Sequence, residues 1–180
     1  DLLTAPGQRV YMPETGAGCP MADMAGASQA EACAARVTPV WGRDWVPIVY
    51  VNSTAALKAF CGRRGGSACT SSNAFRVFRW ALDAGKRILF MPDEHLGTNI
   101  AHDAGLPDEA VVLYDPHAPS GGVADADLQR ARVAVWKGYC HVHQAFTAET
   151  VRAARARSPG ARVIVHPESP RDAVREADFH

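Results

Sequence analysis

Two short clusters in this sequence carry side chains that could do chemistry directly. Cys140 and His143 stand close together in Gly-Tyr-Cys-His-Val-His, a spacing that suits a thiol nucleophile with its base, or a metal thiolate beside an imidazole. His166 and Glu168 flank Pro167, so an imidazole and a carboxylate stand together, as general acid–base catalysis requires. For the first cluster, a buried cysteine beside a surface histidine is an equally good interpretation.

Phenol, amide and hydroxyl groups form two further candidates. Tyr50 and Asn52 flank Val51, so in an extended strand both side chains point the same way and could contact one ligand. A cross-strand or capping pair explains them equally well. Ser71 and Ser72 precede a helical pattern, where free backbone N–H groups suit a phosphate or carboxylate. Residue types alone favour ordinary N-capping for these serines.

The five cysteines are an odd number and include no Cys-x-x-Cys pair. They cannot all form disulfides within one chain, so we expect reduced thiols and a cytoplasmic protein. Cys19 lies in a Gly-Ala-Gly-Cys-Pro turn, where small neighbours leave the sulfur accessible. Cys33 and Cys61 fall within helical patterns and are expected to be packing residues.

Short apolar runs rich in β-branched residues alternate with helical patterns along the chain, which predicts parallel sheets with helices outside. Strands are expected at residues 9–12, 47–51, 67–70, 86–91, 111–114, 132–136 and 162–166. Helices are expected at residues 20–36, 54–60, 74–82, 96–104, 148–158 and 171–177. Residues 115–129, rich in Pro and Gly, are expected to form a surface loop.

The reactive groups fall just after the predicted strands. In open parallel sheets, ligands bind in the crevice beyond the carboxyl ends of the strands, so this distribution predicts an active site there. Composition excludes other classes: 19 basic residues balance 19 acidic ones, which gives no basic face for nucleic acid. No apolar run approaches the ~20 residues that cross a bilayer. We therefore expect a globular chain that binds neither nucleic acid nor membrane.

Six segments, in this order, resemble the motifs of the quinolinate synthase family. They are residues 14–23, 50–58, 69–74, 92–99, 138–143 with Phe146, and 166–168. The resemblance implies condensation of iminoaspartate with dihydroxyacetone phosphate to quinolinate, with loss of water and phosphate, in NAD biosynthesis. It also implies three-layer α/β/α units with parallel sheets, arranged as three similar domains around a 4Fe-4S cluster that acts as a Lewis acid.

The resemblance also implies roles for individual residues. Cys19 and Cys140 match two cluster ligands, and the third cysteine is expected outside this chain; Cys69 matches no ligand position. Tyr50, His166 and Glu168 are the expected catalytic residues, with Tyr50 transferring a proton and Glu168 serving as acid or base. Substrate contacts are expected from Tyr50, Val51, Asn52, Ser71 (or its neighbour Ser72), His143, His166, Pro167 and Glu168.

The resemblance implies that this chain is a central fragment of the enzyme, without its N-terminal and C-terminal parts. Residues 1–45 would end a first α/β domain, residues 46–136 form the second, and residues 137–180 link to and begin the third. Such a fragment is expected to hold no stable cluster and to be inactive alone. The implied partners are the two substrates, an L-aspartate oxidase or aspartate dehydrogenase that supplies iminoaspartate, and iron–sulfur assembly proteins.

Two interpretations from other classes remain open. One is a non-catalytic α/β module that binds a small dicarboxylate or phosphate through Ser71, Ser72 and Asn52. The other is a zinc hydrolase that uses the nitrogen, sulfur and oxygen donors of Cys140, His143, His166 and Glu168. The hydrolase interpretation leaves Cys19, Tyr50 and Asn52 without a role.

Overall fold

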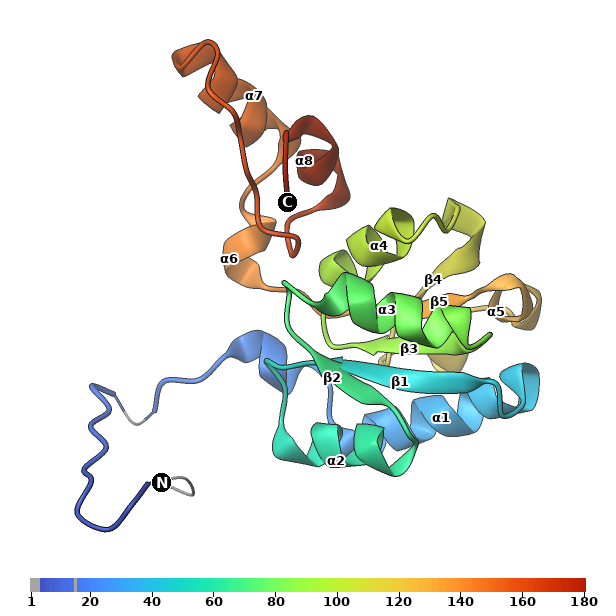
Figure 1. The fold of residues 1–180 in the computed structure, drawn as a ribbon. Coiled ribbons are helices and arrows are strands. Elements are labelled where there is room, and N and C mark those ends of the chain that lie inside the picture. The colour runs from blue at the N-terminus through green and yellow to red at the C-terminus, as the bar shows by residue number, and fades with distance from the viewer. Residues whose placement is uncertain (1–3, 15) are drawn as a thin grey trace.

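A computed structural model describes residues 4–14 and 16–180. Its sheet has five parallel strands in the order β2-β1-β3-β5-β4 (Figure 1). The strands are β1 Trp45–Tyr50, β2 Ser67–Cys69, β3 Arg87–Met91, β4 Val111–Tyr114 and β5 Val133–Trp136. The parallel sheet confirms the predicted α/β class, whereas the larger three-domain arrangement and its boundaries stay predictions.

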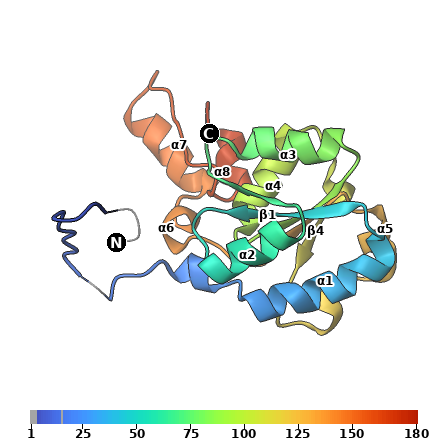
Figure 2. The same ribbon diagram turned by 60° about the horizontal axis from the view of Figure 1, so that its bottom comes forward.

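Helices cover both faces of this sheet. They are α1 Ala27–Trp41, α2 Ala55–Arg63, α3 Ala74–Asp83, α4 Glu94–Asp103, α5 Asp125–Arg130, α6 His141–Gln144, α7 Ala148–Arg157 and α8 Arg171–Glu176, with short 3-10 turns η1 Pro20–Asp23, η2 Asp108–Ala110 and η3 Pro119–Gly122. One apolar core lies between the sheet and α1, α2 and α5, and a second lies under α3 and α4 (Figure 2). The result is the three-layer arrangement expected from the sequence.

Side-chain alternation along β1 decides what faces the site. Val46, Ile48 and Tyr50 belong to the core under α3 and α4, whereas Trp45 and Val49 belong to the core under α1 and α2. Parallel strands covered on both sides read as continuous apolar runs, which is why β1 is recognisable from the sequence. The same alternation puts the phenol of Tyr50 on the α3/α4 side, at the carboxyl end of β1.

The strand order creates a crevice between two particular strands. The chain moves from β1 outward to β2, then returns to the other side of β1 to form β3. Connections leave β1 and β3 in opposite directions, and this topological switch point is where open α/β sheets bind ligands. Tyr50 closes β1 at this point, and Asp93 follows β3.

Helix α4 approaches β3 and β5 most closely at Gly97. A Cβ added at Gly97 would lie 2.5 Å from Phe90 Cδ1 and 2.7 Å from Val135 Cγ1, so glycine is required for this approach. Asp93 is the N-cap of this helix, and its Oδ1 accepts a hydrogen bond from Leu96 N at 2.7 Å. This cap fixes the start of α4 beside the crevice.

Two predicted strands were wrong. Residues 9–12 are exposed and carry no strand, although they contain Val10, Tyr11 and Met12. Residues 162–166 form only one isolated bridge, between Ile164 and Phe179. Both segments have β-branched or aromatic residues, but a strand forms only where a neighbour supplies its ladder of hydrogen bonds. Among the described residues, 9–12 have no such neighbour, and 162–166 have only the short segment at Asp178 and Phe179.

Residues 115–129 are more ordered than the predicted surface loop. They contain η3 and α5, and Leu128 of α5 is buried in the core under α1. Trp41 Nε1 donates to Leu128 O at 2.6 Å. The segment also binds α1 from outside, where Arg36 Nη2 lies 2.5 Å from Asp125 Oδ1. Its Pro and Gly residues therefore form the short turn η3, and the helix that follows places Leu128 in the core.

The chain beyond β5 leaves the sheet at its carboxyl edge. There α7 and α8 pack on each other, and α8 also contacts α4 (Figure 1).

The predicted helix at 20–36 is divided into η1 and α1, because Gly26 caps α1 one residue before it begins. No helix among residues 4–14 and 16–180 has the length and hydropathy of a membrane span. All five cysteines are free thiols.

Candidate functional site

The crevice at the ends of β1 and β3 begins with Tyr50. Its side chain is only 6% exposed, and its hydroxyl lies beside Ser71, which follows β2, and Glu168 from the C-terminal segment. Burial raises the pKa of the phenol, and the negative charge of Glu168 raises it further. Tyr50 therefore keeps its proton at neutral pH and can donate it.

Glu168 is the most buried acid contributed by the C-terminal segment, with 2% of its surface exposed. Its Oε2 lies 3.3 Å from His143 Nε2 and 3.6 Å from His166 Nδ1. Its Oε1 is buried and has no hydrogen-bond partner among the described residues. Burial raises the pKa of this carboxyl, although the Tyr50 hydroxyl opposes the rise. Such a carboxyl can exchange protons closer to neutral pH than a solvated one.

His143 and His166 form a stacked pair, with ring centroids 4.1 Å apart and an angle of 11° between the planes. The backbone N–H of Glu168 donates to His166 Nδ1 at 3.2 Å, which makes that nitrogen the acceptor of a neutral ring. Burial lowers the pKa of both imidazoles, and His143 lowers that of His166 further. Both rings are therefore neutral at pH 7, so their contacts with Glu168 do not supply a full positive charge.

Asp93 is a site residue whose role the sequence did not reveal. It is fully buried; beyond capping α4, its Oδ2 accepts a hydrogen bond from Cys140 N at 3.1 Å. Burial raises the pKa of Asp93 to about 7, the charge of Glu168 adds to the rise, and the two backbone N–H groups oppose it. The available signal was its position directly after β3, inside the segment 92–99.

Asn99 is a second residue that sequence reasoning missed. Its side chain is fully buried in α4, and Nδ2 donates to Pro167 O and to Ser169 O, both at 2.9 Å. These two acceptors flank Glu168 in the chain. Asn99 therefore clamps the backbone that carries the buried carboxylate, and an amide on the first helix after β3 was the only hint in the sequence.

Cys140 is the thiol of this crevice. Its Sγ, a ring nitrogen of His143 and a carboxylate oxygen of Glu168 all lie within 4.8 Å of one another. Gly138 allows the chain to enter this region, because a Cβ there would lie 2.4 Å from Pro92 O. The donor set combines sulfur, nitrogen and oxygen, a mixture that binds metals of intermediate softness.

Cys19 lies exposed just before η1. The segment that follows it is held next to Cys140: Tyr139 N donates to Met24 Sδ at 3.3 Å, and Trp136 Nε1 donates to Met24 O at 2.8 Å. The remaining thiols are core residues, as expected for packing cysteines. Burial raises their pKa to about 12 for Cys33, about 11 for Cys61 and about 12 for Cys69.

A cavity of about 400 Å³ adjoins the crevice and is lined in part by Ser71, Ser72, His166 and Pro167. The two serines differ in their contacts. Ser71 lies beside the Tyr50 hydroxyl, whereas Ser72 Oγ lies 3.0 Å from Thr70 Oγ1. The structure thus brings together Tyr50, Ser71, Cys140, His143, His166, Pro167 and Glu168. Val51, Asn52 and Cys19 are exposed, outside these contacts.

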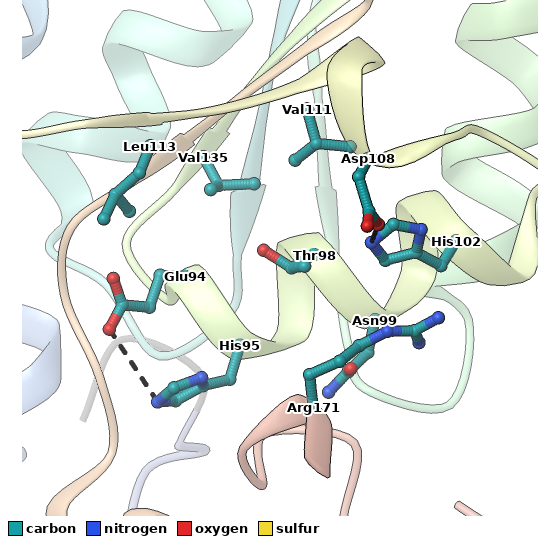
Figure 3. Close-up of a pocket in the computed structure, with 10 residues that line it drawn as sticks. All are labelled: Glu94, His95, Thr98, Asn99, His102, Asp108, Val111, Leu113, Val135 and Arg171. Carbon is teal, nitrogen blue, oxygen red and sulfur yellow. Dashed lines mark ion pairs between the residues drawn. The ribbon is translucent and has the colours of Figure 1, made fainter. Parts of the chain in front are cut away.

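A second cavity, of about 310 Å³, is lined in part by Asn99 (Figure 3). It is bounded by α4, by Arg171 of α8 and by an apolar wall from β4 and β5. His95 Nε2 is buried there without a hydrogen-bond partner among the described residues and lies 3.8 Å from Glu94 Oε1. None of the residues expected in the site lines this cavity.

Comparison with known proteins agrees with the resemblance seen in the sequence. A family model described as "Quinolinate synthetase A protein" matches residues 1–180. Similar curated proteins are the quinolinate synthase of Corynebacterium glutamicum, 46% identical over 179 residues, and that of Bacillus cereus strain B4264, 44% identical over 179 residues. These matches cover 99% of this chain, but only 45% and 48% of the two relatives. The chain therefore spans about half the length of the curated relatives that it matches.

Proposed function

Because this chain belongs to the quinolinate synthetase A family, we propose that it forms the central part of a quinolinate synthase. The whole protein would condense iminoaspartate with dihydroxyacetone phosphate to quinolinate, releasing water and phosphate. Relatives named for this activity support an enzyme of NAD biosynthesis. Since the chain spans about half of their length, we assign turnover to the whole protein and none to this chain alone.

One observation carries the proposal beyond the family: Tyr50 and Glu168 meet at the switch point of the sheet. A condensation that loses water needs one group to protonate a departing hydroxyl and another to remove a proton from carbon. Tyr50 holds a proton that it can donate, and burial gives Glu168 a raised pKa. Together they form a neighbouring acid and base, and both side chains are buried.

The surrounding residues suit the binding of small anionic substrates. We assign Ser71 to a phosphate or carboxylate, because it lies beside the Tyr50 hydroxyl and lines the cavity of about 400 Å³. His143 would orient a substrate oxygen through the ring that contacts Glu168. Asn52, exposed beyond β1, is assigned to the same substrates through its amide N–H.

The residues present fit a 4Fe-4S cluster in part. Cys140 and Cys19 offer accessible thiols, whereas the other three cysteines are buried. We propose that the part of the whole protein beyond this chain supplies a third thiolate. When bound, such a cluster supplies a Lewis acid at an iron with an open position. In this chain, Asp93 would hold the backbone of Cys140 in place for it.

Anaerobic analysis of the full-length gene product tests this proposal. About four irons and four sulfides per chain are expected for this cluster type, with loss of both in Cys140→Ser and retention in Cys69→Ala. Glu168→Gln should keep the iron and lower the rate of quinolinate formation by about 10²–10⁴. Iron that is retained in Cys140→Ser, or full activity in Glu168→Gln, would contradict the assignment.

A further inference from the structure

Three donor atoms in the crevice have the spacing of a single-ion site. Cys140 Sγ, His143 and Glu168 contribute donors that all lie within 4.8 Å of one another. Nitrogen and oxygen ligands bind zinc at about 2.0–2.1 Å, which places two ligands of a tetrahedral ion about 3.4 Å apart. His143 Nε2 and Glu168 Oε2 are separated by 3.3 Å. This pair already has the required separation, and the Cys140 sulfur lies within 4.8 Å of both donor atoms.

The charge of the crevice favours a cation. Glu168 Oε1 is buried and has no hydrogen-bond partner among the described residues, a costly arrangement for a carboxylate. Within residues 4–14 and 16–180, the groups at ion-pair distance from Glu168 are the two histidines, and no Lys or Arg is among them. A cation held by both carboxylate oxygens would satisfy Oε1 as well as Oε2 and would balance the charge of Glu168.

Each of the three donors is also held in place by a neighbour. The backbone of Cys140 donates to Asp93, the ring of His143 stacks on His166, and the chain on both sides of Glu168 is fixed by Asn99. Metal sites in proteins depend on such supporting contacts to orient their ligands. Neighbouring residues therefore fix the positions of all three donor residues, unlike those of independent surface side chains.

We propose that Cys140, His143 and Glu168 bind one divalent cation, Zn²⁺ or Fe²⁺, with a fourth position open to water. Sulfur and imidazole ligands select these ions over Mg²⁺ and Ca²⁺, which prefer oxygen. The site uses neither Cys19 nor any residue outside this chain, which separates it from the cluster proposed above. Because both groups need the thiolate of Cys140, the single ion and the cluster exclude each other, so bound zinc blocks cluster loading.

Cobalt titration of the 180-residue chain, stripped of metal with a chelator, tests the site. Co²⁺ substitutes for Zn²⁺ and gives visible bands and a sulfur-to-cobalt charge-transfer band. One Co²⁺ per chain is expected, displaced by Zn²⁺. Cys140→Ser should abolish the charge-transfer band, whereas Cys19→Ser should leave it unchanged. Glu168→Gln and His143→Gln should weaken Co²⁺ binding by more than the ~100-fold that loss of a supporting residue alone can cause.

Two outcomes would overturn the inference. One is a wild-type chain that gives no charge-transfer band. The other is a band that Cys19→Ser removes as completely as Cys140→Ser, because that result would mean a two-thiolate site. Circular dichroism and urea midpoints of each variant separate lost binding from lost folding. The titration involves no substrate, iron or sulfide, so its failure is distinguishable from failure of the quinolinate synthase proposal.

Discussion

Replacing Asn99 with alanine tests whether one buried amide holds the segment that carries Glu168. In the structure, Asn99 Nδ2 donates to Pro167 O and Ser169 O, both at 2.9 Å. Alanine removes both donors and leaves two carbonyl groups without their partners. The segment containing His166 and Glu168 should then separate from α4 more often.

The size of the effect follows from the burial of the two acceptors. Ser169 is buried, so its orphaned carbonyl costs about 1–3 kcal/mol, whereas the half-buried Pro167 can recover water and costs about 1 kcal/mol. Together they predict a loss of about 2–4 kcal/mol in the free energy of unfolding. Asn99→Asp should be at least as harmful, since a carboxylate facing two carbonyls has the shape of asparagine without its donors.

Urea unfolding measures the loss, and hydrogen exchange locates it. Faster exchange is expected at the amide of Ser169, which donates to His166 O at 2.9 Å in the intact segment. Thr98→Ala is the matched control: Thr98 lies next to Asn99 in α4 and lines the same cavity, and it should cost no more than about 0.5 kcal/mol. If Asn99→Ala is no more damaging than Thr98→Ala and exchange at Ser169 is unchanged, the clamp does not exist.

Three further predictions concern packing, charge and a buried hydrogen bond. Gly97→Ala should lower the free energy of unfolding by about 1–3 kcal/mol through overpacking against Phe90; Gly62→Ala, on a helix with open space around it, should be neutral or stabilising in the same urea assay. Burial raises the pKa of Asp93 from 3.8 to about 7, so the folded state binds the extra proton between these values, and stability of the metal-free chain should fall as pH rises through this range. Asp93→Asn should flatten that dependence between pH 5 and pH 7, and an unchanged slope would contradict the assignment. Trp41→Phe removes the buried bond from Nε1 to Leu128 O and should cost about 1–3 kcal/mol; full retention of stability would show that α5 does not depend on it.

Much of the fold was predictable because the three central strands, β1, β3 and β5, are buried on both faces of the sheet. Pro47 to Val51 and Ile88 to Met91 form continuous apolar runs, and β1 and β3 lie within one or two residues of them. The local sequence pattern gave wrong predictions where a neighbouring strand is needed for a strand to form. Residues 9–12 have the composition of a strand but lie beside no other strand among the described residues.

The candidate site was predictable only where position in the sheet implies proximity. Tyr50 and Ser71 follow neighbouring parallel strands, so the rule that ligands gather at the carboxyl ends of such strands correctly predicts that the two lie together. Asp93 and Asn99 were not recognised, because their importance comes from contacts with residues 47 to 70 positions away. A single sequence shows an acid or an amide, but not which distant backbone group it holds.

Because Tyr50 and Glu168 come from different parts of the chain, a ligand that contacts both should stabilise the folded protein. Tyr50 ends a strand of the sheet, whereas Glu168 lies in the C-terminal segment that α4 holds. A ligand that touches both side chains stabilises the docked arrangement by mass action, about 2.7 kcal/mol at a concentration of 100 times its Kd. Melting temperature therefore reports occupancy directly, and a library of small anions can be ranked by thermal shift without a catalytic assay.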